Sequence, residues 1–332
     1  MPTASGLAGW FTFFLLLTAI GTWLARRYAL VRRLMDEPGE RRSHVIPTPR
    51  GGGIAIVGAL LAALVALIVM RPESRGILVP ATAGLLLVAM IGWIDDHRPL
   101  SPWLRLVVHV MGAGLLGAGC LLVGQGMVAA LVAFALALVL VNAWNFMDGI
   151  NGLAVSQAAL VSMACLAMAL TLSSGGGLFG LALLAACLGF LPFNFPSARI
   201  FLGDVGSGAV GYALALLLAL AGEGQTERIW LILPLSAFLL DTALTLGARI
   251  VRRERWWTPH VQHLYQRLAR QWSGHTGVTL AYAGWTVASA WLAWCVRSGG
   301  LVTIMGAVFI WYALGAAIWL AARRVQRLGA ES

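Results

Sequence analysis

Four aspartates interrupt an otherwise apolar sequence, each where a hydrophobic run ends. Asp95 and Asp96 form an adjacent pair, and Asp148 and Asp204 follow later runs. The chain has only 13 acidic residues, and a carboxylate at membrane depth is costly unless it serves a function. If the four side chains gather on one side of a membrane, they would form a cage for a divalent cation. This pattern suggests chemistry on phosphate groups.

Asparagines extend the pattern around Asp148. Asn142, Asn145, Asp148 and Asn151 recur every three residues, a spacing that keeps neighbours on one slowly turning face of a helix. The glycines that follow would end the helix and let the backbone approach a ligand. Amide and carboxylate oxygens suit Mg²⁺, which usually shares its coordination shell with substrate phosphates. We therefore predict a Mg²⁺ site, with Mn²⁺ as the alternative ion.

The segment around Asp204 combines several groups that suit phosphate binding. Arg199 and Phe201 precede the aspartate, and a Gly/Ser-rich turn follows it. Such a turn at the start of a helix can present backbone N–H groups to a phosphate. Glycine packing between transmembrane helices is the alternative explanation for the turn. Packing does not explain the aspartate, so we favour a functional site.

Two basic segments carry histidines. His260 and His263 lie in the largest basic loop, without acidic or thiol partners at zinc-site spacing. A pair that faces phosphate is the favoured interpretation, and ordinary surface histidines are the alternative. His44 and Arg50 precede the second apolar run in a Pro/Gly-rich segment, for which a plain basic interfacial loop is the alternative. We interpret His109, inside an apolar run, as a bundle histidine with satisfied hydrogen bonds.

The composition is that of a polytopic helical membrane protein. The 332 residues are 60% hydrophobic and 11% charged, with a mean hydropathy of +0.84. All 23 basic residues are arginine, so Schiff-base chemistry and a P-loop lysine are excluded. Arginine suits bidentate phosphate contacts better than lysine does. Because the arginines occupy short loops rather than one basic face, the net charge of +10 does not indicate nucleic acid.

Eleven apolar runs are long enough to cross a bilayer core of about 30 Å. We predict an all-α polytopic integral membrane protein, with residues 1–332 forming a single transmembrane catalytic domain. The predicted spans are 7–25, 51–70, 77–94, 103–123, 127–145, 153–172, 178–195, 205–221, 228–249, 276–296 and 301–322. The predicted cytoplasmic loops lie near 26–50, 95–103, 146–152, 196–205 and 250–275.

The distribution of arginine predicts the orientation of these spans. Nineteen of the 23 arginines fall on one side of the predicted membrane. The positive-inside rule then places the N-terminus outside and the C-terminus in the cytoplasm. The aspartate, asparagine and histidine motifs all fall on the arginine-rich side, although the arginine count was not used to choose them. We therefore expect an active site that faces the cytoplasm.

Five motifs in this order resemble the polyprenyl-phosphate N-acetylhexosamine-1-phosphate transferase superfamily, the WecA/MraY-like glycosyltransferase family 4. They are HVIPTPRGGGIAI, the Asp95-Asp96 pair, NFMDGINGLA, ARIFLGDVGSG and the HLYQRL segment. The resemblance spans roughly residues 30 to 280, and the NFMDGING and HLYQRL segments are most similar to WbpL-type enzymes that initiate O-antigen synthesis. It implies transfer of a HexNAc-1-phosphate from a UDP-sugar to undecaprenyl phosphate in the bacterial cytoplasmic membrane. UMP would be released, and a homodimer is mildly favoured.

The resemblance also implies roles for the nucleotide and metal site. Asp204 and Asn145 match the residues that hold catalytic Mg²⁺. Phe201 matches the aromatic residue that stacks on uracil, and Asn151 matches a position near the nucleobase. Asp148 matches an acid near the nucleotide or the metal. The amide at 151 stands where the family often has an acid, which argues against an essential acid there.

The lipid phosphate and the pyrophosphate have their own implied partners. Asp95 and Asp96 match a pair near the lipid phosphate, with Asp95 as the candidate to activate it. His260 and His263 match a histidine-rich loop that meets the pyrophosphate, although Gln262 replaces one family histidine. The predicted catalytic residues are Asp95, Asp96, Asp148 and Asp204. The predicted substrate-binding residues are His44, Arg50, Asn142, Asn151, Arg199, Phe201, His260 and His263.

Two other classes of protein are alternatives to this enzyme. A secondary transporter could use the aspartates as ion-coupling sites, but such sites usually lie near the membrane midplane on repeated halves. A lipid-binding scaffold would need neither the aspartate pair nor the Asn/Asp series. Within the enzyme hypothesis, the sequence leaves open a covalent Asp95 intermediate or direct displacement. It also leaves open whether the sugar is N-acetylglucosamine, N-acetylfucosamine or N-acetylquinovosamine.

Overall fold

The computed structural model describes residues 3–37, 46–168, 171–172, 174–221, 226–255, 257–258, 260–272 and 274–331. Helices dominate these residues, as the all-α prediction requires. The α-helices are α1 (Ala4–Arg32), α2 (Ile54–Met70), α3 (Arg75–His97), α4 (Pro102–Leu122), α5 (Gly126–Met147), α6 (Leu153–Met168), α7 (Gly175–Asn194), α8 (Gly203–Ala221), α9 (Ser236–Val251), α10 (Leu264–Gln271), α11 (His275–Val296) and α12 (Leu301–Glu331). Two 3₁₀ segments, η1 (Pro72–Ser74) and η2 (Thr226–Leu235), precede α3 and α9.

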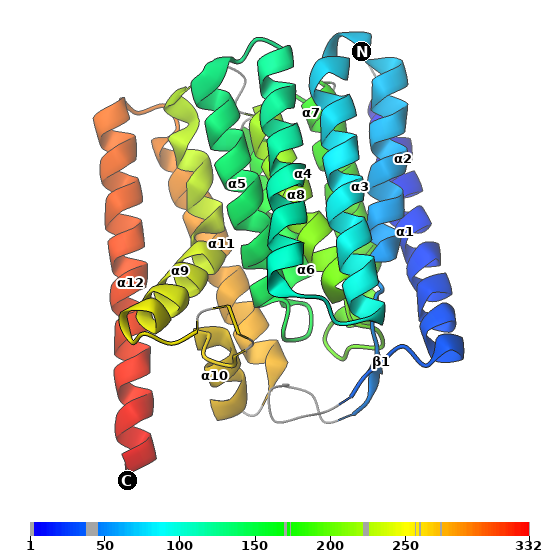
Figure 1. Cartoon of the computed structure of the whole chain (residues 1–332). Coiled ribbons are helices and arrows are strands. Elements are labelled where there is room, and N and C mark those ends of the chain that lie inside the picture. Colours follow the sequence, from blue (N-terminus) through cyan, green and yellow to red (C-terminus); the bar gives the residue numbers. More distant parts are fainter. Residues whose placement is uncertain are drawn as a thin grey trace.

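The long helices stand side by side in one bundle, with the two termini at opposite ends (Figure 1). α8 lies in the interior and is buried along almost its whole length. Small residues allow this position, because a Cβ atom on Gly211 would lie 2.3 Å from the carbonyl oxygen of Leu140 on α5. α8 therefore packs tightly against its neighbours and forms a rigid support for the residue at its first turn.

Within the described residues, eight helical segments are long and apolar enough to cross a membrane. Two further apolar helices, α2 and α6, are shorter. Among the described residues, each predicted apolar run falls largely on one helix, except that the run at 228–249 is divided between η2 and α9. The structure thus supports a polytopic membrane protein, while the total of eleven spans and the orientation stay predictions.

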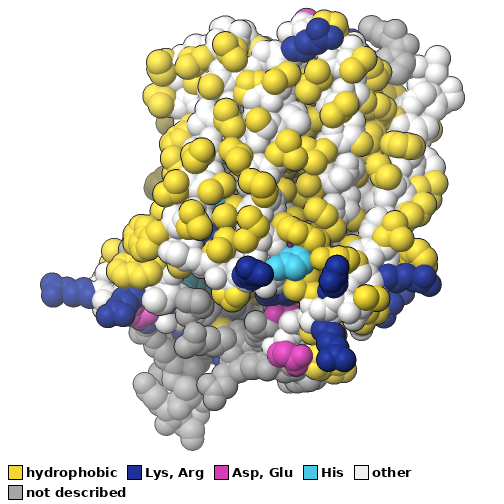
Figure 2. Space-filling view, turned by 45° about the vertical axis from the view of Figure 1, so that its right-hand side comes forward, with side chains coloured by type: hydrophobic (Ala, Val, Ile, Leu, Met, Phe, Trp, Pro, Cys, Tyr) yellow, Lys and Arg dark blue, Asp and Glu magenta, His cyan; other side chains and the backbone are white. Residues whose placement is uncertain are grey.

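The outer surface agrees with a bilayer environment. Figure 2 shows hydrophobic side chains over the middle of the visible face, with most of its arginines at the lower end. The exposed side of α12 is an example, since Val302 is 86% exposed and Phe309 is 75% exposed. Lipid would cover such residues in a membrane.

A short β ladder, which the sequence analysis did not predict, lies at the lower end of the bundle. β1 (Met35–Asp36) pairs with β2 (Thr48–Pro49) in antiparallel register. The chain then continues into a second contact, where Phe201 N donates to the Pro49 carbonyl at 2.8 Å and Gly53 N donates to the Leu202 carbonyl at 2.8 Å. The Pro/Gly-rich segment before α2 is thereby fixed to the segment that enters α8.

Candidate active site

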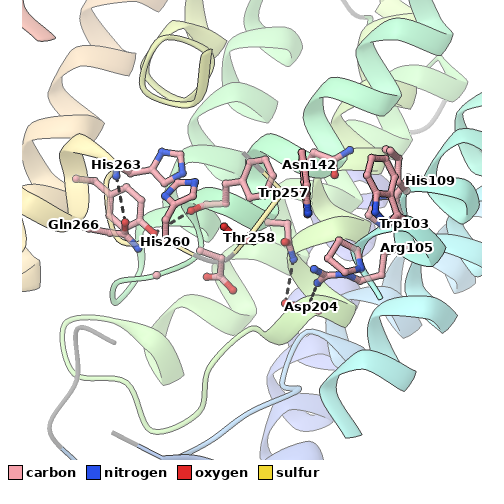
Figure 3. A pocket seen from close by; sticks show the side chains of 17 residues that line it. Trp103, Arg105, His109, Asn142, Asp204, Trp257, Thr258, His260, His263 and Gln266 are labelled. Atoms are coloured by element: carbon pink, nitrogen blue, oxygen red, sulfur yellow. Dashed lines mark hydrogen bonds and ion pairs between the residues drawn. The ribbon is translucent and has the colours of Figure 1, made fainter. Parts of the chain in front are cut away.

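A cavity of about 350 Å³ lies among the lower ends of α4, α5, α8 and α10. Figure 3 places Asp204 and Arg105 toward one side of this cavity and the two histidines, His260 and His263, toward the other. Six residues predicted for the site line the cavity together: Asn142, Asn145, Asp148, Asp204, His260 and His263. The cavity therefore joins motifs that are more than 100 residues apart in the sequence.

Asp204 enters the cavity from the first turn of α8. Gly203 precedes it with φ +77°, a left-handed conformation that favours glycine. A Cβ atom at this position would also lie 2.6 Å from a carboxylate oxygen of Asp96. The Asp96 carboxylate accepts the backbone N–H groups of Asp204 and Val205, each at 3.1 Å. It thus caps the N-terminus of α8 from another helix.

Asp96 does not line the cavity and is only 2% exposed. Arg50 also contacts it, because Arg50 Nη2 donates to the Asp96 carbonyl and the Arg50 Nε lies 4.0 Å from the carboxylate. These contacts support a positioning role for both residues. Direct contact of Asp96 or Arg50 with substrate stays a prediction.

Arg105, which was not among the predicted site residues, joins two of the predicted acids. Its Nη1 donates to Asp95 at 2.8 Å and to Asp204 at 2.9 Å. Asp95 also accepts the backbone N–H of Leu100 at 2.6 Å, so both of its oxygens have partners. The guanidinium offsets the repulsion between two carboxylates that come from different helices. Arg105 itself lines the cavity and presents a cation there.

Asn145 supports Asp204 from α5. Its Nδ2 donates to Asp204 Oδ1 at 3.0 Å and to Ser207 Oγ at 3.1 Å. The amide is therefore oriented by two groups on α8. Asn142 lies one turn earlier and donates to the Leu138 carbonyl at 2.7 Å. The spacing of these asparagines on α5 thus brings both side chains to the cavity, as the sequence pattern indicates.

Asp148 follows the last residue of α5 and lines the cavity. Removal from water, and then the negative charge of Asp96, raises the pKa of Asp148 to about 8. This shift favours the neutral carboxyl when no cation is bound. A bound cation would favour the ionised form.

The histidine wall is formed by the segment that enters α10. The ring centroids of His260 and His263 are 4.9 Å apart. Removal from water, followed by the nearby charges of His263 and Arg249, lowers the pKa of His260 to about 4. The His260 ring is therefore neutral at physiological pH and can both donate and accept hydrogen bonds.

The prediction that His109 is a bundle histidine with satisfied hydrogen bonds is wrong. It lines the cavity, and its buried Nδ1 has no hydrogen-bond partner among the described residues. His109 lies four residues after Arg105 on α4, so the two side chains share one face of the helix. This i, i+4 pair of polar residues in an apolar run was the sequence signal for this side of the site.

The remaining predicted residues lie outside the cavity lining. Asn151 Nδ2 donates to the Pro196 carbonyl at 3.0 Å, and its backbone carbonyl accepts from Thr279 at 2.8 Å. Arg199 donates to the Pro192 carbonyl at 2.6 Å, next to the backbone contact of Phe201 with the β2 segment. Their substrate-binding roles stay predictions. His44 lies outside the described residues.

The oxygen atoms at the cavity wall suit Mg²⁺, which needs few protein ligands, better than they suit a metal ion that is coordinated only by side chains. Among the described residues, no three His, Cys, Asp or Glu side chains group as a metal site. The Asp204 carboxylate and the Asn145 amide instead offer a small set of oxygens beside an open cavity. Mg²⁺ usually takes one or two protein ligands and completes its shell with water and substrate phosphates. Its presence stays a prediction.

Comparisons with known proteins show which family the chain resembles. A family model described as glycosyl transferase family 4 matches residues 78–222. The decaprenyl-phosphate N-acetylglucosaminephosphotransferase of Mycobacterium tuberculosis (strain ATCC 25618 / H37Rv) is 33% identical over 292 residues, covering 75% of this chain and 72% of the relative. A probable undecaprenyl-phosphate N-acetylglucosaminyl 1-phosphate transferase of Bacillus subtilis (strain 168) is 28% identical over 279 residues, covering 76% and 75%.

A third relative comes from another branch. The phospho-N-acetylmuramoyl-pentapeptide-transferase of Moorella thermoacetica is 34% identical over 236 residues, covering 60% of this chain and 69% of the relative. The matched family region contains the aspartate pair, the asparagine series and Asp204. The chain therefore belongs to glycosyl transferase family 4, the superfamily of WecA/MraY-like sugar-phosphate transferases.

Proposed function

We propose that this protein transfers a HexNAc-1-phosphate from a UDP-sugar to undecaprenyl phosphate and releases UMP. The observation that carries the proposal is the contact of Arg105 with both Asp95 and Asp204 at the wall of the cavity. A cation held between two acids, beside an amide and across the cavity from two histidines, suits a reaction between two phosphate groups. The product would be undecaprenyl-diphosphate-sugar, the lipid that initiates an O-antigen-type polysaccharide.

In the proposed reaction, an oxygen of the acceptor phosphate attacks the β-phosphorus of the UDP-sugar. A new P–O bond forms, and the bond from that phosphorus to the bridging oxygen breaks. The electron pair of the broken bond leaves on UMP. Two anions must approach one another in this step, so positive charge and hydrogen-bond donors at the cavity wall lower the barrier. When bound, Mg²⁺ would neutralise charge on the pyrophosphate.

Each cavity wall has a distinct task in this reaction. On one side, Arg105 binds phosphate oxygens, while Asp204 and Asn145 would hold the ion. On the opposite side, His260 and His263 hydrogen-bond the pyrophosphate from the α10 segment. These groups hold the two phosphates in position, which accounts for much of the catalysis of phosphoryl transfer.

The environment of Asp95 favours direct displacement. Both of its oxygens have partners, Leu100 N and Arg105 Nη1, and the side chain does not line the cavity. A nucleophile for a covalent intermediate must instead reach the phosphorus. We propose that Asp95 contributes by orienting Arg105 toward the acceptor phosphate.

The positions of the acids also argue against a transporter. Asp96 lies in the last turn of α3, Asp148 directly after α5 and Asp204 in the first turn of α8. All three are at helix ends, whereas transporter ion sites usually lie at the bilayer midplane on interrupted helices. We propose that the site faces the cytoplasm from the bacterial cytoplasmic membrane, where a UDP-sugar can reach it.

The test uses purified protein, undecaprenyl phosphate, Mg²⁺ and UDP-sugars labelled with ³²P at the β-phosphate. We expect labelled lipid and unlabelled UMP with at least one donor from a panel of UDP-GlcNAc, UDP-FucNAc and UDP-QuiNAc. Chelation of divalent cations should abolish transfer, and Mn²⁺ should restore part of it. Absence of labelled lipid with every donor would reject the proposed reaction.

A further inference from the structure

Besides Asp96, a second buried aspartate lies outside the cavity and has no role in the reaction described above. Asp241 is on α9 and is only 2% exposed. An ionised carboxylate at such a position is costly unless hydrogen bonds compensate for lost water. Asp241 lies within the apolar run at 228–249, so its sequence neighbourhood gives no sign of a polar site.

Two of its partners are backbone groups at the start of α10. The Asp241 carboxylate accepts the N–H of Leu264 at 2.8 Å and the N–H of Tyr265 at 3.1 Å. These N–H groups belong to the first turn of the helix, which has no partners of its own for them. Asp241 therefore caps α10 from another helix and fixes the residue just before it, His263.

Three side chains hold the Asp241 carboxylate in place. Tyr282 Oη on α11 donates at 2.8 Å, Trp319 Nε1 on α12 donates at 3.2 Å and Thr245 Oγ1 on α9 donates at 3.1 Å. Helices distant in the sequence thus converge on one side chain. A network with every acceptor site in use is rigid, and a rigid network fixes the groups it contacts.

His263 is the group that this network places in the cavity wall. Its Nδ1 lies 3.7 Å from Asp241 Oδ1, and the ring is stacked near Phe146 and Tyr265, with centroids 6.1 and 5.9 Å away. The ring is 2% exposed yet lines the cavity. Neither ring nitrogen has a hydrogen-bond partner among the described residues. Nδ1 faces Asp241, so Nε2 is the ring nitrogen left for a ligand.

A carboxylate from another helix also caps a helix N-terminus at the other cavity wall. Asp96 accepts two consecutive backbone N–H groups at the start of α8 and so places Asp204. Asp241 accepts two consecutive backbone N–H groups at the start of α10 and so places His263. Each cavity wall therefore has a helix N-terminus that is fixed by a buried carboxylate from a different helix.

We infer that Asp241 is a positioning residue, which holds the His263 ring where it meets the pyrophosphate of the donor. The inference rests on the proposed function above. It extends the active site to α12, because Trp319 supports Asp241 and Arg323 Nη2 donates to the Gln262 carbonyl at 3.1 Å. The C-terminal helix is thereby tied to the histidine segment at two points.

A double-mutant cycle tests whether Asp241 acts through His263. The variants are Asp241→Asn, His263→Gln and the combination, with kcat and KM measured in the labelled-lipid assay. A displacement of a catalytic group by about 1 Å can cost about 100-fold in rate, so we expect each single variant to lower kcat by about 10- to 100-fold. The double variant should be no slower than His263→Gln alone, since the two residues act as one unit. Costs that multiply would overturn the inference.

Because Asp241→Asn could prevent folding, a smaller change near Asp241 provides an independent test. Trp319→Phe removes one donor to Asp241 without changing the cavity lining, and it should lower kcat in the wild-type background but not in His263→Gln. Glu73→Gln, at a residue that is 66% exposed and pairs with Arg71 on the other end of the bundle, is the matched control and should leave kcat unchanged. A Trp319→Phe effect of equal size in both backgrounds would contradict the positioning role.

A second measurement does not depend on activity. Hydrogen exchange should become faster at the amides of 264–268 in Asp241→Asn, while the amides at the start of α8 keep their protection. Unchanged exchange at 264–268 would overturn the inference even if transfer were detected. A wild-type protein without transfer activity, together with faster exchange in the variant, would reject the proposed reaction and retain the capping of α10.

Discussion

The carboxylate of Asp96 accepts the backbone N–H of Asp204 at 3.1 Å, although the two residues are 108 positions apart. This bond joins the end of α3 to the start of α8. Because α8 is buried along almost its whole length, the position of Asp204 is determined by the interior of the bundle. The acid that faces the cavity is therefore held by packing and by a cap rather than by a surface loop.

The first prediction concerns this cap. In Asp96→Asn, one oxygen can still accept an N–H, but the amide group would face the second donor. A buried donor without a partner costs about 1–3 kcal/mol, so we expect the free energy of unfolding to fall by about that amount. Denaturation in detergent measures it, with Glu73→Gln as the control. A variant as stable as the wild type would mean that the cap contributes nothing.

The second prediction concerns Asp204 itself. Asp204→Asn keeps the size of the side chain and removes its charge, so we expect a loss of more than about 100-fold in kcat, as for an altered metal ligand. The backbone N–H of Asp204 still reaches Asp96, so the melting temperature without Mg²⁺ should change little. The stabilisation that Mg²⁺ gives the wild type should disappear. Near-normal turnover would remove Asp204 from the metal site.

The third prediction concerns Arg105. Arg105→Gln leaves Asp95 and Asp204 without the cation between them and removes a positive charge from the cavity wall. We expect kcat/KM for undecaprenyl phosphate to fall by about 100-fold, in line with the loss of one electrostatic contact to a developing charge. Arg71→Gln, at a partly exposed pair with Glu73, is the matched control. Equal activity of both variants would remove Arg105 from the reaction.

The helices and one wall of the site could be predicted from the sequence because their signals are local. Apolar runs gave the positions of the helices, and the three-residue spacing of Asn142 and Asn145 placed both on the cavity side of α5. Contacts between segments that are far apart in the chain leave no local pattern in the sequence. The bonds of Gly53 and Phe201 between the β2 segment and the entry to α8 depend on the packed fold, and hydropathy does not encode them.

Asp241 is a second example of a feature that the sequence alone does not reveal. A single acid within the apolar run at 228–249 has too little effect on mean hydropathy to be noticed. Its five hydrogen-bond donors lie on residues from 245 to 319, so only the fold assembles them. His109 was misread for a related reason, since an apolar neighbourhood in the sequence does not reveal that one face of α4 borders a cavity.

The fourth prediction follows from the pKa of Asp148. That pKa is about 8 in the folded protein and near the ordinary value of 3.8 in the unfolded chain. Below about 4 both states are protonated, whereas above about 8 the folded state must hold an unfavourable charge. The stability of the protein without Mg²⁺ should therefore fall between these pH values. Melting temperatures in detergent across this range should show a shallower fall in Asp148→Asn, and an identical slope would contradict the shift.

The last prediction concerns orientation. If the N-terminus is outside, the turn between α11 and α12 is also outside, and the segment between α7 and α8 faces the cytoplasm. Cys295 is exposed and the other three cysteines are buried, so Cys295→Ser gives a background with no exposed thiol. In that background, Ser298→Cys should react with a membrane-impermeant maleimide in intact cells, and Ser197→Cys should react only after the membrane is permeabilised. The reverse pattern would place the cavity outside, away from cytoplasmic UDP-sugars, and would reject the proposed reaction in the cell even if the purified protein catalysed it.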